Sequence, residues 1–352
     1  MPSTDKFTGW VGLDAESVKG NLVKTTFSPK EFTDDDIDIK ISHCGMCASD
    51  LHTLRSGWGV TNYPVVVGHE IIGTVTRKGK NVKYEIGDRV GVGAQCYSCL
   101  KPDCYDCTHD NEPTCPDRVF TYDACYPSGD VAYGGYAEEG RYPASFAFKI
   151  PEELPSEIAA PMMCGGITVY SPLRRNGCGP GKVVGIVGIG GLGHFGLLFA
   201  KALGAEEVYA ISRSKAKEAD VLAMGANGII ATNEAGWAAK NSRKFDLIVS
   251  TANSPDMPLN DYTKILKPGG RFVQVGLPEE PIPQFYFGPL VQSNISIGGS
   301  LLGARCEIEE MLALAASQGI KSWVTVYPMS EVNTVLGLME DNKARYRFVL
   351  EN

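Results

Sequence analysis

Short apolar segments separated by turn residues fill the first part of the chain. Four of them, Phe7–Gly12, Asp36–Ile41, Val65–Arg77 and Arg89–Gly93, are rich in Val, Ile and Thr, with Gly, Asn or Asp between them. This pattern is typical of β-strands. No long amphipathic helical pattern interrupts it. We therefore predict that the chain up to about Pro151 is built mainly of β-strands.

The pattern changes after Pro161. The continuous apolar run Val183–Val187 is typical of a strand buried on both faces, and it leads through a glycine-rich turn into Phe195–Leu203, which has helical spacing. Strand-like and helical segments then alternate: Val208–Ile211, Lys215–Met224, Gly228–Ala231, Phe245–Ser250, Gly270–Val275, Ile295–Gly299, Glu307–Ser317 and Arg347–Leu350. Such alternation predicts βαβ units around a parallel sheet, and thus an α/β fold.

Length and composition narrow the class of protein. A chain of 352 residues is long for one core, so two domains are expected. Its apolar runs are far shorter than the roughly 20 residues that cross a bilayer, and Met1–Trp10 has no secretory pattern. A formal charge of −8 disfavours nucleic acid and anionic membranes as partners. We expect a cytoplasmic protein that binds small molecules.

The turn after the first buried strand matches a dinucleotide-binding motif. Gly188, Gly190 and Gly193 fit G-x-G-x-x-G, with Gly191 as an extra glycine. The first glycine permits a tight turn, the second lets the backbone approach a pyrophosphate, and the last lets helix and strand pack closely. A flexible turn is the alternative. The flanking strand and helix are the context that the motif requires.

The end of the next strand indicates which dinucleotide binds. NAD sites usually carry Asp or Glu about 20 residues after the glycine motif, whereas this chain has Ser212, Arg213 and Lys217 there. A hydroxyl and two cations suit a 2′-phosphate, which a carboxylate would repel. The alternative is a solvated turn, although positive charge is unfavourable at a helix start. We therefore expect NADP(H).

The cysteines predict two metal sites. Of eleven cysteines, four are spaced as Cys99-x4-Cys104-x2-Cys107-x7-Cys115, and this set predicts a structural zinc site with four thiolates. Cys96 lies close enough in sequence to replace Cys99. A second, dispersed set suits a catalytic zinc with an exchangeable position, and it comprises Cys44, Cys47, Ser49, His52, His69, Glu70 and Cys164.

Together these segments resemble the zinc-dependent medium-chain dehydrogenase/reductase superfamily. Within it, the chain is most similar to the cinnamyl alcohol dehydrogenase group, which includes fungal NADP-dependent members. The resemblance covers almost the whole chain and is carried by Cys44–His52, Val66–Gly73, the cysteine lobe, Ala160–Tyr170, Gly177–Gly193 and Ser212–Lys217. It implies a GroES-like, β-rich catalytic domain (residues 1–155 and 300–352) and a Rossmann NADP-binding domain (residues 156–299).

The resemblance also implies roles for single residues. Cys47, rather than Cys44, matches the first ligand of the catalytic zinc, with His69 and Cys164 as the others. Glu70 matches a carboxylate that ligates the zinc or lies just behind it. Ser49 matches the hydroxyl that receives the alcohol proton, and His52 the histidine that passes it to solvent. Residues implied near the cofactor or substrate are Thr168, Leu192, Val275, Gly299, Ser300, Arg347 and, in the substrate pocket, Trp58.

One spacing departs from the family pattern. The first gap of the cysteine lobe is usually two residues, but Cys99 and Cys104 are separated by four, including Pro102. The loop could bulge around the same zinc, Cys96 could take part, or the zinc could bind poorly.

The strand Ile295–Gly299 could pair across a two-fold axis, and the resemblance likewise suggests a homodimer.

The expected function is reversible, NADP(H)-dependent reduction of aldehydes to alcohols with two zinc ions per chain. Aromatic, cinnamyl-like or larger apolar aldehydes are the expected substrates, because Trp58 and the aromatic-rich Phe120–Tyr126 and Phe285–Phe287 suggest an apolar pocket. One alternative is a 1,4-reductase of conjugated carbonyl or iminium groups, which can dispense with the Ser49–His52 relay. The other is a non-enzymatic zinc- and nucleotide-binding protein, in which an intact relay has no purpose.

Overall fold

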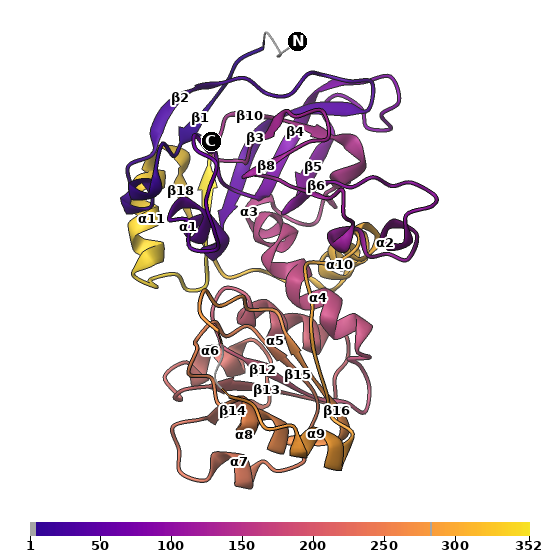
Figure 1. The fold of residues 1–352 in the computed structure, drawn as a ribbon, viewed down its shortest axis with the longest axis vertical. Helices are drawn as coiled ribbons and strands as arrows, with labels where there is room; N and C mark the ends of the chain where they lie inside the picture. Colours follow the sequence, from indigo (N-terminus) through magenta and orange to yellow (C-terminus); the bar gives the residue numbers. More distant parts are fainter. Residues whose placement is uncertain (1–4, 282–283) are drawn as a thin grey trace. The chain divides into compact units, whose positions relative to one another are not determined.

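The computed structural model describes residues 5–281 and 284–352 and divides into two compact units (Figure 1). Unit 1 comprises Met1–Gly165 and Ala304–Asn352, and unit 2 comprises Gly166–Gly303. The first boundary between the units lies after Gly165, which is later in the chain than the predicted boundary between residues 155 and 156. The reason is that α3 (Ser156–Ala159) and the 3-10 helix η4 (Ala160–Met163) pack against the sheet of unit 1.

Unit 1 is built on a seven-stranded sheet. Its order is β11-β5-β4-β3-β19-β18, and β10 also pairs with β3. On β3, Ile37, Ile39 and Ile41 are buried at alternate positions, as expected of a strand with one face on a core. The strands are β3 (Asp36–Met46), β4 (Glu70–Lys78), β5 (Arg89–Val92), β10 (Glu139–Pro143), β11 (Ala147–Lys149), β18 (Val324–Pro328) and β19 (Arg347–Glu351).

Smaller elements surround this sheet. The short strands are β1 (Phe7–Val11), β2 (Val23–Phe27), β6 (Gln95–Tyr97), β7 (Val119–Phe120), β8 (Ala124–Cys125) and β9 (Val131–Ala132). The helices are α1 (Ala48–Leu54), α2 (Tyr105–Thr108), α10 (Arg305–Gln318) and α11 (Val332–Glu340), with 3-10 turns η1 (Ala15–Lys19), η2 (Glu112–Thr114), η3 (Ala144–Phe146) and η5 (Met329–Glu331). The predicted β-rich character of this part of the chain is confirmed.

The strand predicted over Val65–Arg77 starts later than expected. Val65 forms only an isolated bridge to Gly12, and β4 begins at Glu70. Gly68 interrupts the extended backbone because its φ is 96°, a left-handed conformation that favours glycine. This break places His69 just before β4 and Glu70 at its first position.

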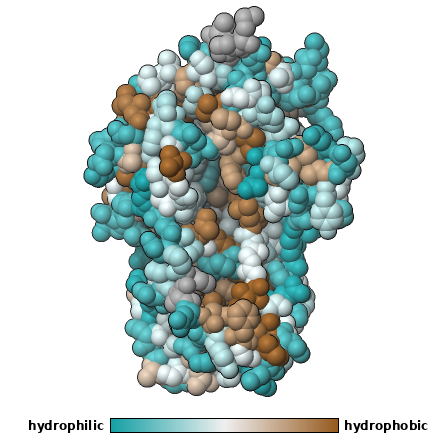
Figure 2. All heavy atoms as spheres, in the orientation of Figure 1, coloured by the Kyte–Doolittle hydropathy of each residue, from teal (hydrophilic) through white to brown (hydrophobic). Residues whose placement is uncertain are grey.

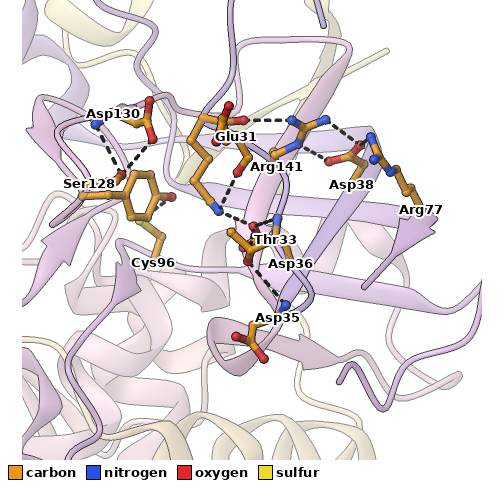
Figure 3. A network of polar contacts seen from close by, with 12 residues as sticks. Glu31, Thr33, Asp35, Asp36, Asp38, Arg77, Cys96, Ser128, Asp130 and Arg141 are labelled. Atoms are coloured by element: carbon orange, nitrogen blue, oxygen red, sulfur yellow. Dashed lines mark hydrogen bonds and ion pairs between the residues drawn. The ribbon is translucent and has the colours of Figure 1, made fainter. Parts of the chain in front are cut away.

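Two buried ion pairs fix the start of β3 (Figure 3). Lys30 pairs with Asp36, and both side chains are almost fully buried. Asp36 also accepts hydrogen bonds from the backbone and the hydroxyl of Thr33, both at 2.7 Å. Arg141 of β10 donates twice to its register partner Asp38, at 2.7 and 3.0 Å. Removing one partner of such a buried pair costs roughly 3–5 kcal/mol. The Arg141–Asp38 pair therefore stabilises the register of β3 and β10, and the Lys30–Asp36 pair ties the preceding segment to the start of β3.

Unit 2 is a six-stranded parallel sheet in the order β14-β13-β12-β15-β16-β17. This is the doubly wound order of dinucleotide-binding folds, so the predicted α/β fold is confirmed. The strands are β12 (Val183–Val187), β13 (Glu207–Ser212), β14 (Gly228–Ala231), β15 (Phe245–Ser250), β16 (Leu266–Gln274) and β17 (Ser296–Gly299). The helices are α4 (Gly165–Arg175), α5 (Gly193–Ala202), α6 (Glu218–Ala223), α7 (Trp237–Lys240), α8 (Leu259–Lys264) and α9 (Gly288–Ser293).

The helix predicted over Lys215–Met224 is shorter than expected. Helix α6 starts at Glu218, and Lys217 is its N-cap residue, so the basic segment before it is a turn.

Across the described residues, no helix is both long and apolar enough to span a bilayer.

Candidate metal and cofactor sites

Four residues from three parts of unit 1 converge on one point. Cys47 follows β3 and caps α1, His69 lies just before β4, Glu70 is the first residue of β4, and Cys164 follows η4. One potential ligand atom from each lies within 4.8 Å of the others, and all four residues are buried. The sequence proposed these four residues as the catalytic zinc ligands. Two thiols, an imidazole and a carboxylate at this separation form a donor set that suits zinc.

Buried polar atoms without a hydrogen-bond partner support a cation at this cluster. Among the described residues, His69 Nε2 and Glu70 Oε2 are buried and unpaired. The other carboxylate oxygen, Glu70 Oε1, accepts from Arg347 and from the backbone N–H of Gly165 at 3.2 Å. Unpaired buried acceptors are costly unless something else satisfies them. A zinc ion fits both orphaned atoms.

The titration behaviour of the cluster reflects crowding in a dry interior. Bonding to Cys164 and to His69 lowers the pKa of Cys47 well below its usual range, despite burial. Burial would lower the pKa of His69, but the adjacent Cys47 raises it to about 9. Burial raises the pKa of Glu70 to about 7, although Arg347 opposes this. A thiolate is therefore favoured at Cys47, and a thiolate is the form of cysteine that binds metals.

Close packing explains why Cys44 is not a third sulfur ligand. The thiol of Cys44 is fully buried and packs against the turn at Gly68, where a Cβ would lie 2.8 Å from its sulfur. A Cβ at Gly45 would lie 2.1 Å from Glu70 Oε2. Gly45 is therefore required for Glu70 to enter the cluster.

Asp50 is a residue of this site that the sequence analysis missed. Its fully buried carboxylate accepts from the backbone of Cys47 at 2.8 Å, the backbone of Gly68 at 3.1 Å and the hydroxyl of Tyr136 at 2.9 Å. It thus holds together the two turns that carry Cys47 and His69. An acid three positions after a helix N-cap is a capping signal, and Cys47-x-x-Asp50 carries it.

The proposed relay residues lie on helix α1, directly after Cys47. The Oγ of Ser49 is 3.5 Å from Cys47 Sγ. His52 is 9% exposed, and Trp58 stacks on its ring with centroids 4.3 Å apart and planes at 16°. Tyr122, from the aromatic-rich segment, stacks on His69 in the same way at 5.1 Å. Aromatic faces therefore cover both His52 and His69.

The cysteine lobe forms a second group. Cys99, Cys104, Cys107 and Cys115 come together, with Sγ–Sγ distances of 3.8 Å (Cys99–Cys107), 3.9 Å (Cys104–Cys115) and 3.6 Å (Cys99–Cys115). Four sulfurs at about 2.3 Å from a tetrahedral zinc would be about 3.8 Å apart. The donor set and spacing therefore fit a structural zinc.

The long first gap is accommodated by a bulge. Leu100 adopts a left-handed conformation (φ 47°), and the backbone N–H of Cys104 bonds to the carbonyl of Lys101 at 3.1 Å to close a turn. Cys96 takes no part in the lobe, because its thiol is fully buried and lies 3.2 Å from the hydroxyl of Tyr126. The loop therefore bulges so that Cys99, and not Cys96, joins the other three cysteines of the lobe.

The glycine motif of unit 2 joins β12 to α5. Gly188 has φ 82°, and a Cβ on Gly193 would lie 1.9 Å from the carbonyl oxygen of Gly188. A Cβ on Gly190 would meet nothing within 4 Å, so space for a ligand lies beside it. These three environments agree with the separate reasons for a glycine at each position.

The basic turn that was predicted to bind the 2′-phosphate follows β13, the first strand after the glycine motif and α5. Ser212 ends β13, Arg213 is exposed, and the amine of Lys217 donates to the carbonyl of Ile189 in the glycine loop at 2.5 Å. Lys215, which the sequence analysis did not select, pairs instead with Glu234 at 2.8 Å. Ser212 and Arg213 thus lie at the end of β13, and Lys217 contacts the glycine loop.

The remaining candidates are divided between the units. Thr168 is buried in α4, Val275 follows β16, and Ser300 follows β17; these three belong to unit 2. Arg347 belongs to unit 1 and is buried beside Glu70.

Comparisons with known proteins agree with this architecture. Residues 33–152 match the alcohol dehydrogenase GroES-like domain, and residues 191–317 match the zinc-binding dehydrogenase family. The chain is 46% identical to NADP-dependent alcohol dehydrogenase 6 of Saccharomyces cerevisiae, over 99% of this chain and 98% of that protein.

Solved structures show the same relationship. A cinnamyl alcohol dehydrogenase from Sorghum bicolor superposes with a TM-score of 0.92 at 34% identity, covering 99% of this chain and 98% of that one. The chain belongs to the zinc-dependent medium-chain dehydrogenases, in the cinnamyl alcohol dehydrogenase group. An enzyme of this group from Helicobacter pylori, solved with NADP(H), superposes with a TM-score of 0.89 at 30% identity, covering 98% of each chain.

The geometry of the lobe predicts which cysteine holds its zinc. Cys99→Ser should remove about one zinc ion per chain and lower the thermal denaturation midpoint, because three thiolates bind zinc less tightly and the lobe has no core of its own. Cys96→Ser, the matched control, should keep the zinc. Metal analysis by mass spectrometry measures both. Zinc loss in Cys96→Ser with retention in Cys99→Ser would reverse the assignment.

Proposed function

We propose that the chain is an NADP(H)- and zinc-dependent alcohol dehydrogenase that interconverts aldehydes and alcohols (EC 1.1.1.-). The observation that carries this proposal is the buried cluster of Cys47, His69, Glu70 and Cys164 with the Ser49 hydroxyl 3.5 Å from one of its sulfurs. The NADP-dependent yeast relative and the NADP(H)-bound bacterial structure support the choice of cofactor.

The roles proposed for the chain's own residues follow from their positions. Zinc, when bound, supplies a Lewis acid, and NADPH supplies a hydride. Ser49 holds a proton at its Oγ beside the metal ligands, where it can donate it to the oxygen of the reduced substrate. His52, one turn further along α1, resupplies that proton. Glu70, held by Arg347, balances charge at the metal.

The cofactor is proposed to bind unit 2 through several groups. The loop Gly188–Gly193, including Gly191 and Leu192, takes the pyrophosphate at the start of α5. Ser212, Arg213 and Lys217 take the 2′-phosphate. The remaining proposed cofactor contacts are Thr168, Val275, Ser300 and, in unit 1, Arg347.

We further propose that the substrate is an aromatic or larger apolar aldehyde. Trp58 is 42% exposed and stacks on His52, while Tyr122 stacks on His69, so an aromatic ring lies against each histidine. An apolar ring stacks favourably on such faces. The protein is expected to act in the cytoplasm.

A homodimer is proposed through the edge of the unit 2 sheet. Strand β17 lies at the end of the sheet and all its residues are exposed. Near it in sequence, Phe287 and Val291 are 68% and 78% exposed, and Figure 2 shows apolar side chains gathered on the visible face of unit 2. A sheet edge with apolar neighbours is suited to pairing with a second copy.

Ser49→Ala tests the proposed chemistry. The variant should keep its zinc and bind NADPH, while kcat for aldehyde reduction falls by about 100-fold or more, because general acid catalysis is lost. NADPH consumption with cinnamyl and aliphatic aldehydes measures this, and analysis of the products with an unsaturated aldehyde separates allylic alcohol from saturated aldehyde. Saturated aldehyde as the main product, or a fully active Ser49→Ala variant, would contradict the proposal.

The cofactor proposal has its own test. Arg213→Asp should weaken NADPH binding by about tenfold or more and leave NADH binding little changed, because only NADPH carries the 2′-phosphate that the carboxylate repels. Fluorescence titration with both cofactors measures the change. Lys215→Met is the control, since Lys215 is paired with Glu234. Equal loss of both cofactors in Arg213→Asp would argue against this role.

A further inference from the structure

The side chain of Arg55 occupies one ring nitrogen of His52. Arg55 caps the C-terminal end of α1, one turn after His52, and its Nη2 lies 3.0 Å from His52 Nδ1. A guanidinium has only N–H donors and stays protonated. Nδ1 must therefore be the acceptor in this contact, and the neutral ring carries its one proton on Nε2.

A second helix holds Arg55 in this position. Glu340, the last residue of α11, receives two hydrogen bonds from Arg55 Nη1, at 3.0 and 3.3 Å. The ion pair is partly solvated, with Arg55 32% and Glu340 50% exposed. Exposed pairs of this kind contribute little to stability. Glu340 therefore positions Arg55 at Nδ1, while the ion pair itself adds little stability.

This contact conflicts with net proton transfer through His52. A neutral imidazole that gives up its Nε2 proton must take a proton at Nδ1, since the doubly deprotonated ring is inaccessible near neutral pH. Arg55 cannot supply that proton and blocks the nitrogen that would receive it. The structure thus shows His52 in a state that can donate a hydrogen bond but cannot turn over.

We propose that Arg55 is a gate on the solvent end of the Ser49–His52 relay, held closed by Glu340. This inference rests on the proposed function. When Arg55 leaves, a solvent proton binds Nδ1 while the Nε2 proton passes to the relay, and the ring stays neutral as the Nδ1–H tautomer. Because Nδ1 is then a donor, Arg55 returns only after Nε2 has taken up a proton from solvent and Nδ1 has released its proton to solvent, which restores the Nε2–H form. The gate thus resets after each proton delivered.

The trapped tautomer can be measured without substrate or cofactor. The chain has five histidines, so a long-range ¹H–¹⁵N spectrum of the zinc-loaded protein can resolve their rings, with His52→Asn identifying the His52 signals. At about pH 8, wild type should show His52 in the Nε2–H form. The double variant Arg55→Glu/Glu340→Arg keeps the ion pair but puts an acceptor at Nδ1, so it should switch His52 to Nδ1–H. An Nδ1–H wild type, or an unswitched double variant, would overturn the proposal.

Turnover then distinguishes a gate from a positioning contact. Arg55→Met and Glu340→Gln open the gate, so kcat for aldehyde reduction should stay within about twofold of wild type or rise. Lys78→Met, which breaks a surface ion pair with Glu85 elsewhere in unit 1, is the control. A larger loss in both gate variants, with zinc and NADPH binding intact, would overturn the gate and make Arg55 a positioning residue. Absence of turnover in wild type would instead refute the proposed function and leave the tautomer measurement standing.

Discussion

The placement of two thiols, an imidazole and a carboxylate within 4.8 Å of each other in a buried part of unit 1 is the constraint on which the site depends. Without a cation, such a cluster leaves His69 Nε2 and Glu70 Oε2 unpaired and buries the Cys47 thiolate beside the Glu70 carboxyl group. A divalent metal satisfies the orphaned atoms and offsets the charge. Neighbouring residues make this arrangement possible. Asp50 joins the turns that carry Cys47 and His69, and Gly45 and Gly68 allow Glu70 and His69 to enter the cluster.

Much of this could be predicted from the sequence because the chemistry is local. The glycine motif, the Cys-x2-Cys spacing and the His69-Glu70 pair each place particular residue types at short, diagnostic distances in the sequence. The alternation of apolar runs after Pro161 likewise fixes the parallel sheet of unit 2, whose strand order then follows from the doubly wound topology.

What the sequence could not predict depends on contacts between distant segments. Nothing near Cys96 in the chain indicates that its thiol faces Tyr126 rather than the cysteine lobe, and the left-handed Leu100 is not a residue that signals a bulge. The pairing of Arg55 with Glu340 joins residues 285 positions apart. Strand β4 begins late because of one backbone angle at Gly68, which a β-rich pattern cannot report.

The proposed relay and the metal cluster share one short helix. Helix α1 carries Ser49 and His52, and Cys47 is its N-cap residue. Asp50 fixes the start of α1 beside the cluster, and Arg55 ties its end to α11. In the proposed mechanism, proton delivery and metal binding therefore depend on the position of the same helix.

The zinc content of Cys164→Ser tests the central claim most directly. The account predicts about two zinc ions per chain in the wild type and about one in this variant, with the cysteine lobe still filled and aldehyde reduction lost. A variant that kept both zinc ions, or that reduced aldehydes at the wild-type rate, would contradict the assignment of this cluster as the catalytic metal site.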